Sequence, residues 1–430
     1  MAGQPALIPE AESMLLRRRH GLAFAALVCG GLQAAAPRWP AIDGDFSGVL
    51  RLDALGDAAP LAWHTHLQTT AEGPPIVDLE VTSHGLALHA HLTLPTSDAP
   101  GTWRLSEGMI ELETWLPVAL ARAGGAALPP DLAATGAVRV AGEGTWRDTD
   151  VSGRVTVAME NATAGSTAQN WSGTGLAIAA ELVLAKNLPT VHALRIGGET
   201  MRAAGLTLRR IAIEAAGDPG GRLEVRRAEV EMLGGRVALA PFTFDPAAPS
   251  IDTTAEFIGV GLGEIATLAP QALAEAHGEL GGRVAVRWSG PAGAEPGAGT
   301  LQVGTGTLAT VRLAAKPGFL TQSVPVRFNL IGESLGSLSR LLSLENPAYD
   351  TLRRIELGEL PLVVDALEVK LYPDGPDGAV SARVELSGHP AEANSAVGVV
   401  SFSVNVAGPL SQVLQLGLQK NASMSVSSGR

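Results

Sequence analysis

Two pairs of histidines are the residues whose type and spacing come closest to a reactive site. His64 and His66 form one pair, and His89 and His91 form the other. Residues two apart on a β-strand point to the same face, and imidazole pairs of this kind can bind zinc or copper. In a simple meander, however, the strand 76–81 would separate the two pairs by roughly 9–10 Å. The sequence therefore favours histidines on a solvent-exposed face, with a metal site as the alternative.

Other patterns typical of catalysis do not stand out in the sequence. There is no Ser/His/Asp order, no paired carboxylate motif and no phosphate-cradling loop; Gly304-Thr305-Gly306 precedes no helical pattern and predicts a turn. Trp115 and Trp288 are predicted to close a groove or hold a helix rather than to stack on a sugar. We therefore expect a protein that is not an enzyme and that uses no cofactor.

Composition indicates an ordered, aliphatic β protein. Hydrophobic residues make up 46% of the chain and charged residues only 17%, so a large apolar surface can be buried. The 51 glycines and 28 prolines punctuate the chain as often as many short strands require. A net charge of −12 argues against nucleic-acid binding, because phosphate backbones need cationic surfaces.

The elements expected to carry these residues are mostly strands. Leu223–Trp288 alternates apolar and polar residues in several short runs, which is typical of sheet. Within it, apolar residues of 262–273 recur at spacings of three to five and predict a short covering helix. Met109–Arg122 resembles this helix, and Gly136 resembles the turn at Gly278. The chain is therefore predicted to contain a degenerate internal repeat.

The chain is divided into three predicted segments. Residues 1–36 are a signal or targeting segment, 37–180 an N-terminal β-groove segment and 181–430 a second β-groove segment, with one continuous sheet expected through the last two. A loop is predicted over Ala292–Gly299 and a further short helix over Leu335–Leu344.

The N-terminal residues predict export. Arg17-Arg18-Arg19 precede an apolar run over 21–28, and small residues follow up to Ala36, as in a secretory signal. The run is shorter than the ~20 residues that span a bilayer, so a permanent anchor is the less favoured alternative.

The expected fold is mainly β, with one long, curled antiparallel sheet and a few short covering helices. Roughly twenty strands would form a long ribbon whose apolar face the helices are too few to cover. Twist would curl this face into an elongated hydrophobic groove. A closed core with the same alternation and no ligand is the alternative, and the residues alone leave both interpretations open.

Several motifs resemble a known family. Gly234-Gly235-Arg236-Val237 and Ala276 to Gly282 come first, and Leu367 to Leu371, Val400 to Val406 and Gly408-Pro409-Leu410 follow in the same order. In this order they resemble the YdbH family of intermembrane phospholipid transport proteins. That family belongs with the AsmA-like and TamB-like bridge proteins of Gram-negative envelopes.

The resemblance covers residues 180–418 by motif and 45–180 by pattern. It implies a periplasmic β-groove that conducts phospholipids between the inner and outer membranes and contributes to outer-membrane homeostasis. It further implies contact with phospholipid acyl chains and both membrane surfaces, a small outer-membrane lipoprotein as partner, no enzymatic step, and attachment to the inner membrane through the N-terminus.

Eleven apolar residues are the predicted groove lining. They are Val237, Leu239, Phe242, Phe244, Phe257, Val284, Val286, Val400, Phe402, Val404 and Val406. Two other hypotheses compete with the groove. One is a secreted structural or interaction β protein with a closed core, and the other is an envelope protein that binds metal through the paired histidines.

Overall fold

The computed structural model describes most of the chain after the predicted targeting segment. The described residues are 42–50, 60–69, 73–122, 131–203, 206–268, 273–289, 294–304, 308–329, 343–373, 380–407 and 427–428. Residue contacts divide the chain into two units. One comprises Met1–Ala168, Leu176–Arg195 and Gly217–Gly221, and the other Gln169–Gly175, Ile196–Ala216 and Arg222–Arg430.

The predicted fold class is confirmed. The described chain is mainly β, with one large antiparallel sheet that is not closed, a separate two-stranded pair and a few short helices. Antiparallel pairing suits the sequence, since short runs joined by Gly-containing turns return the chain beside itself. At Gly85, for example, φ is 67°, a left-handed conformation that favours glycine in the two-residue turn between two strands.

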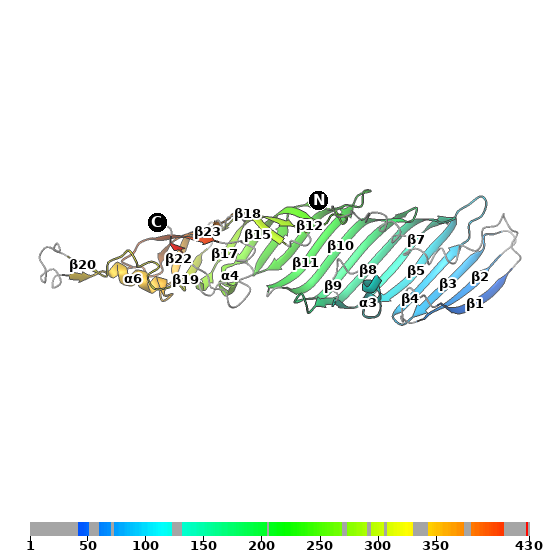
Figure 1. Cartoon of the computed structure of the whole chain (residues 1–430), viewed down its shortest axis with the longest axis horizontal. Helices are drawn as coiled ribbons and strands as arrows, with labels where there is room; N and C mark the ends of the chain where they lie inside the picture. Colours follow the sequence, from blue (N-terminus) through cyan, green and yellow to red (C-terminus); the bar gives the residue numbers. More distant parts are fainter. Residues whose placement is uncertain are drawn as a thin grey trace, which may run out of the picture. The chain divides into compact units, whose positions relative to one another are not determined.

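The first unit is built on consecutive antiparallel strands (Figure 1). Its elements are β1 (Asp43–Leu50), β2 (Leu61–Gln68), β3 (Ile76–Ser83), β4 (Leu86–Thr93), β5 (Gly101–Glu111), α3 (Leu112–Arg122), β6 (Ala133–Thr135), β7 (Ala137–Arg147) and β8 (Asp150–Ser166). Pairing runs from β1 to β5 in order; β7 then lies between β5 and β8, and β6 pairs with β8.

Three long strands follow and are divided between the two units. They are β9 (Trp171–Ala185), β10 (Leu188–Ala203) and β11 (Leu206–Gly217). The segment boundary predicted at residue 180 falls inside β9 and stays a prediction.

The second unit carries the remaining strands. They are β12 (Leu223–Met232), β13 (Gly235–Leu239), β14 (Phe242–Phe244), β15 (Ile251–Gly261), β16 (Leu273–His277), β17 (Glu279–Trp288), β18 (Ala294–Val303), β19 (Ala309–Leu313), β20 (Arg327–Asn329), β21 (Ser343–Glu345), β22 (Leu362–Leu371), β23 (Val380–Pro390), β24 (Val400–Ala407) and β25 (Ser427–Ser428). The helices are α4 (Leu262–Leu268) and α6 (Pro347–Glu356).

Pairing in this unit runs through β12, β13, β15, β17, β18, β22, β23 and β24, and β14 lies beside β12. The first half of β22 pairs instead with β19, which in turn pairs with β16. The sheet therefore divides at β22 into two branches.

The predicted repeat is present as a structural motif. In each copy a strand leads into a helix, a short strand, a glycine turn and a longer strand: β5, α3, β6, β7 and β15, α4, β16, β17. The first helical residue donates its main-chain N–H to the turn glycine, Leu112 to Gly136 at 2.8 Å and Leu262 to Gly278 at 2.9 Å. The two turn glycines have φ values of 121° and 122°.

Close packing as well as conformation requires glycine at both turns. A Cβ atom at Gly136 would lie 3.0 Å from the Cβ of Ala162, and one at Gly278 would lie 2.6 Å from the Cβ of Ala309. Both alanines are almost fully buried. The turns thus hold each helix and short strand close to the sheet.

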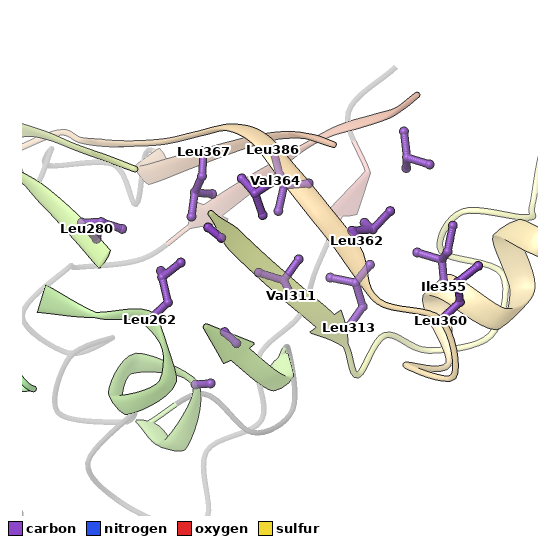
Figure 2. Close-up of a cluster of buried hydrophobic side chains, with 14 residues drawn as sticks. Leu262, Leu280, Val311, Leu313, Ile355, Leu360, Leu362, Val364, Leu367 and Leu386 are labelled. Carbon is purple, nitrogen blue, oxygen red and sulfur yellow. The ribbon is translucent and has the colours of Figure 1, made fainter. Parts of the chain in front are cut away.

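A closed apolar core lies where α4, α6 and β19 meet β22 and β23 (Figure 2). Its buried residues are Leu262, Ala266, Ala276, Leu280, Ala309, Val311, Leu313, Ile355, Leu360, Leu362, Val364, Leu367, Leu386 and Val400. Figure 2 shows side chains from both helices and several strands converging on one space. We call this group the sealed core.

Local signals account for α6, which sequence periodicity alone did not predict. The side chain of Asn346 caps the helix by accepting the N–H of Ala348 at 3.0 Å, and Pro347 occupies the first turn. Ile355, fully buried, brings the last turn into the sealed core.

Two predicted boundaries differ from the structure. The loop predicted over Ala292–Gly299 is strand from Ala294 onward, because β18 pairs with β17 despite its many small residues. The helix predicted over Leu335–Leu344 is wrong at its end, since β21 begins at Ser343; its other residues lie outside the described ranges.

Candidate functional site

Most of the predicted lining residues fall in register on one apolar face of the second unit. One cross-strand row contains Val237, Phe257, Gly282, Leu301, Val369, Val384 and Val404. The next row contains the positions of Leu239, Ala255, Val284, Gly299, Leu371, Ala382 and Val406. Directly paired residues share a face, so six of the candidate positions lie on one surface that crosses seven strands.

The other candidates adjoin these rows or end them. Val286 follows Val284 at a spacing of two and pairs with Thr253. Phe242 and Phe244 pair with Val225 and Leu223 on β12.

Burial varies along the face. Val237 and Val284 are buried, at 7% and 4% exposure. Leu239, Phe242, Phe244, Phe257, Val286 and Val404 are partly exposed, and the side chain of Val406 lies outside the described ones. The face therefore retains accessible apolar surface among its buried positions.

One end of the face is covered by the sealed core. Val400 is a member of that core and Phe402 packs against it. The ring of Phe402 also meets the ring of Phe319 edge to face, with centroids 5.5 Å apart. Leu301 and Val384 of the first row also pack against the sealed core, so accessible surface is confined to the remainder of the face.

The reverse face of the same strands is charged. Glu256 pairs with Arg283 at 3.0 Å, and Glu385 pairs with Arg383 at 2.7 Å. On β12 the Arg227 guanidinium donates to Glu229 and lowers the pKa of that carboxyl. The sheet of this unit is thus apolar on one side and polar on the other.

The sheet of the first unit also has one apolar and one polar face. The sequence predicts strand alternation here, but no lining residues were predicted in this unit. One apolar row contains Gly48, Trp63, Val81, Leu88, Gly108, Val140 and Val157. A row on the reverse face contains Asp45, His66, Asp78, His91, Arg104, Glu143 and Arg154. The alternation of apolar and polar residues in 61–68 and 76–81 continues in the strands that follow. Extending it to those strands would have identified the residues of both rows.

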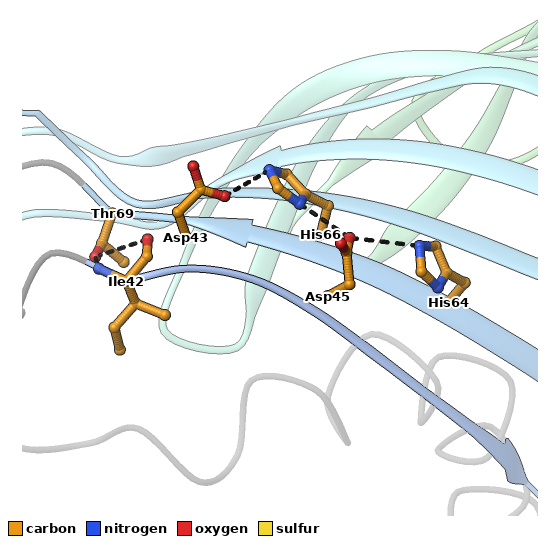
Figure 3. A network of polar contacts seen from close by, with 6 residues as sticks. All are labelled: Ile42, Asp43, Asp45, His64, His66 and Thr69. Carbon is orange, nitrogen blue, oxygen red and sulfur yellow. Dashed lines mark hydrogen bonds and ion pairs between the residues drawn. The ribbon is translucent and has the colours of Figure 1, made fainter.

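The paired histidines lie on this reverse face. Figure 3 shows Asp45 between the two imidazoles of β2, 3.0 Å from His66 Nδ1 and 3.6 Å from His64 Nε2. On β4, His91 Nδ1 lies 2.6 Å from Asp78, and His89 Nε2 lies 3.5 Å from Glu80.

As expected for a meander, β3 separates the two histidine pairs. Within the described ranges no three histidine, cysteine or carboxylate side chains are arranged to hold a metal ion.

A carboxylate in the first unit holds a loop in place. Asp131 accepts hydrogen bonds from the N–H of Ala168 at 2.7 Å and from the hydroxyls of Ser166 and Thr167. The Ala168 N–H, followed by the Ser166 hydroxyl, lowers the pKa of Asp131 to about 2. These bonds fix the end of β8 beside the start of β6.

These observations define a β protein with an open sheet, whose candidate site is an extended apolar face. Comparison with known families agrees: residues 27–294 match the family model described as YdbH-like, the intermembrane phospholipid transport protein YdbH. Because the match covers more than half of the 430 residues, the chain belongs to the YdbH-like family, a family of lipid transport proteins.

The match contains the first group of family motifs and stops before the group that begins at Leu367. No curated protein and no solved structure matched the chain. In the described ranges no helix has the length and apolar character needed to cross a membrane.

Proposed function

We propose that this protein carries phospholipids between the inner and outer membranes of a Gram-negative bacterium by holding their acyl chains on the apolar face of its sheet. The observation that carries the proposal is the cross-strand row from Val237 to Val404, which keeps apolar or glycine positions in register through seven strands. Membership of a phospholipid transport family supports it.

Such a face is expected to bind lipid tails without holding them at one position. Removing apolar area from water stabilises a lipid tail by about 25 cal/mol per Å². The rows present no charged side chain on that face, so a tail that moves from one row to the next breaks no hydrogen bond. Acyl chains can therefore slide along the face.

The finer parts of the proposal concern the surroundings of the chain. We place it in the periplasm, with both membrane surfaces and a small outer-membrane lipoprotein as partners. Attachment to the inner membrane through the N-terminal segment is supported by the family resemblance and not by the short apolar run over 21–28. In this role it contributes to outer-membrane homeostasis. The transfer involves no covalent step and no cofactor.

Photo-crosslinking of phospholipid in cells tests the proposal. Val286→Asp and Val404→Asp each put a charge on the apolar face, so crosslinking should fall several-fold because a carboxylate must be desolvated where a tail passes. Ser403→Asp is the matched control: it lies next to Val404 on the reverse face, where Ser403 accepts a hydrogen bond from Arg383. Equal losses from Ser403→Asp and Val404→Asp would contradict the proposal.

A structural or interaction protein with a closed core is the second candidate, and the sealed core is the observation that favours it. Mass spectrometry of the purified protein separates the two. Phospholipid that co-purifies and is lost in Val286→Asp supports transport, whereas protein free of lipid in both forms supports the scaffold.

A further inference from the structure

Tryptophans of the first unit lie over glycines of the neighbouring strand. Trp63 is the register partner of Gly48, and Trp146 is the register partner of Gly101. A Cβ atom added at Gly48 would be 2.9 Å from three atoms of the Trp63 indole, so that ring lies flat over the glycine. A Cβ atom at Gly101 would be 2.6 Å from Nε1 of Trp146. Each indole thus occupies the space that a side chain would need.

Trp103 shows the same arrangement on a larger scale. Its register partner is Gly144, and Cβ atoms added at Gly142, Gly144 and Gly153 would be 3.1, 2.7 and 2.7 Å from atoms of its ring. One indole therefore covers three glycines on two strands, β7 and β8. Glycine at all three positions makes room for it, in the manner of aromatic side chains that cover strand glycines in other sheets.

The indole N–H groups of Trp103 and Trp146 are already used. Trp103 Nε1 donates to the main-chain oxygen of Ser152 at 3.2 Å, and Trp146 Nε1 donates to that of Thr93 at 3.2 Å. On the side that faces away from the sheet, these two side chains therefore present aromatic carbon atoms and no free hydrogen-bond donor.

All three tryptophans belong to the apolar face. Trp63 pairs with Val81, and Trp103 pairs with Leu92. Trp63 and Trp103 are partly exposed, and Trp146 is 8% exposed. We call Trp63, Trp103 and Trp146, with the glycines beneath them, the tryptophan floor.

We infer that the tryptophan floor is an acyl-chain contact site at which lipid tails rest directly on indole rings. The inference rests on the proposed function and names residues of the first unit that carry it. A flat aromatic surface with its donors satisfied fits a hydrocarbon chain, which gains from contact area alone. A sugar or a lipid headgroup would instead need free donors or acceptors, which Trp103 and Trp146 do not offer.

Phospholipids with brominated acyl chains test the inference, because bromine quenches tryptophan fluorescence on contact. The full chain is loaded with brominated or ordinary phosphatidylethanolamine, and bound lipid is measured by mass spectrometry. The fluorescence intensity that is lost on loading with brominated lipid should be smaller in Trp103→Phe than in the wild type. It should not change in Trp115→Phe, whose indole on α3 is bonded to the main-chain oxygen of His84. Trp288→Phe reports contact in the second unit, since Trp288 continues the spacing of Val284 and Val286 on its apolar face.

A second variant leaves the floor intact. With Trp39, Trp115, Trp171 and Trp288 replaced by phenylalanine, the remaining emission comes from the floor and should lose most of its intensity on loading with brominated lipid. If lipid is bound and comparison of wild type with Trp288→Phe shows that Trp288 is quenched, but the floor emission of the second variant is not quenched, the inference is overturned while transport stands. If no brominated lipid is bound, the proposed function and the inference both fail.

Discussion

Asp131 shows how much of its surroundings a single side chain can organise. It holds the end of β8 through one main-chain and two hydroxyl donors, and its pKa is lowered from 3.8 to about 2. A carboxylate whose pKa is lower in the folded state contributes stability above its unfolded pKa and loses it as the pH falls through the folded value.

We therefore expect a pH-dependent difference between wild type and Asp131→Asn. The wild type should be more stable at pH values above 3.8, and the difference should shrink as the pH falls toward 2. Chemical unfolding followed across this range measures it. A constant difference between the two proteins at every pH would show that ionisation of Asp131 plays no part.

At the scale of elements, the repeated motif of helix, short strand and glycine turn was visible in the sequence, because Gly136 and Gly278 follow similar helical patterns. The strand alternation was also visible. Which strands would be covered was not visible, because β19 pairs with β22 from far along the chain. Contacts of this range leave no periodic signal in one sequence.

The glycine turn of the second copy can be tested directly. Gly278→Ala places a Cβ atom 2.6 Å from Ala309 in a backbone conformation with φ of 122°, so it should lower the free energy of unfolding by about 1–3 kcal/mol. Gly398→Ala is the control, since an added Cβ there meets no atom within 4 Å. Similar unfolding midpoints for the two variants would argue against a tight turn.

At the scale of the whole molecule, composition and alternation were enough to predict an antiparallel sheet with an apolar face, and the motifs predicted the family to which the chain belongs. They could not separate accessible rows from the sealed core, since Val404 and Val400 belong to the same alternating run. That distinction depends on the second layer above each row, which a strand's own sequence does not encode.

A face whose apolar rows carry no charged side chain should select lipids by tail rather than by headgroup. We expect phosphatidylethanolamine and phosphatidylglycerol with equal tails to compete equally for the purified protein. Shortening the tails should weaken binding by about 0.8 kcal/mol per buried methylene. Competition binding with lipids of matched and shortened tails measures both effects. A headgroup preference larger than the effect of chain length would mean that polar contacts dominate.

The indole hydrogen bonds of the tryptophan floor each skip a strand. Trp103 of β5 is bonded to β8 across β7, and Trp146 of β7 is bonded to β4 across β5. Peeling β5 from β7 would therefore also break bonds to strands on either side, so a pulling force cannot be relieved one ladder at a time. Such cross-bracing gives this region of the sheet resistance to mechanical force.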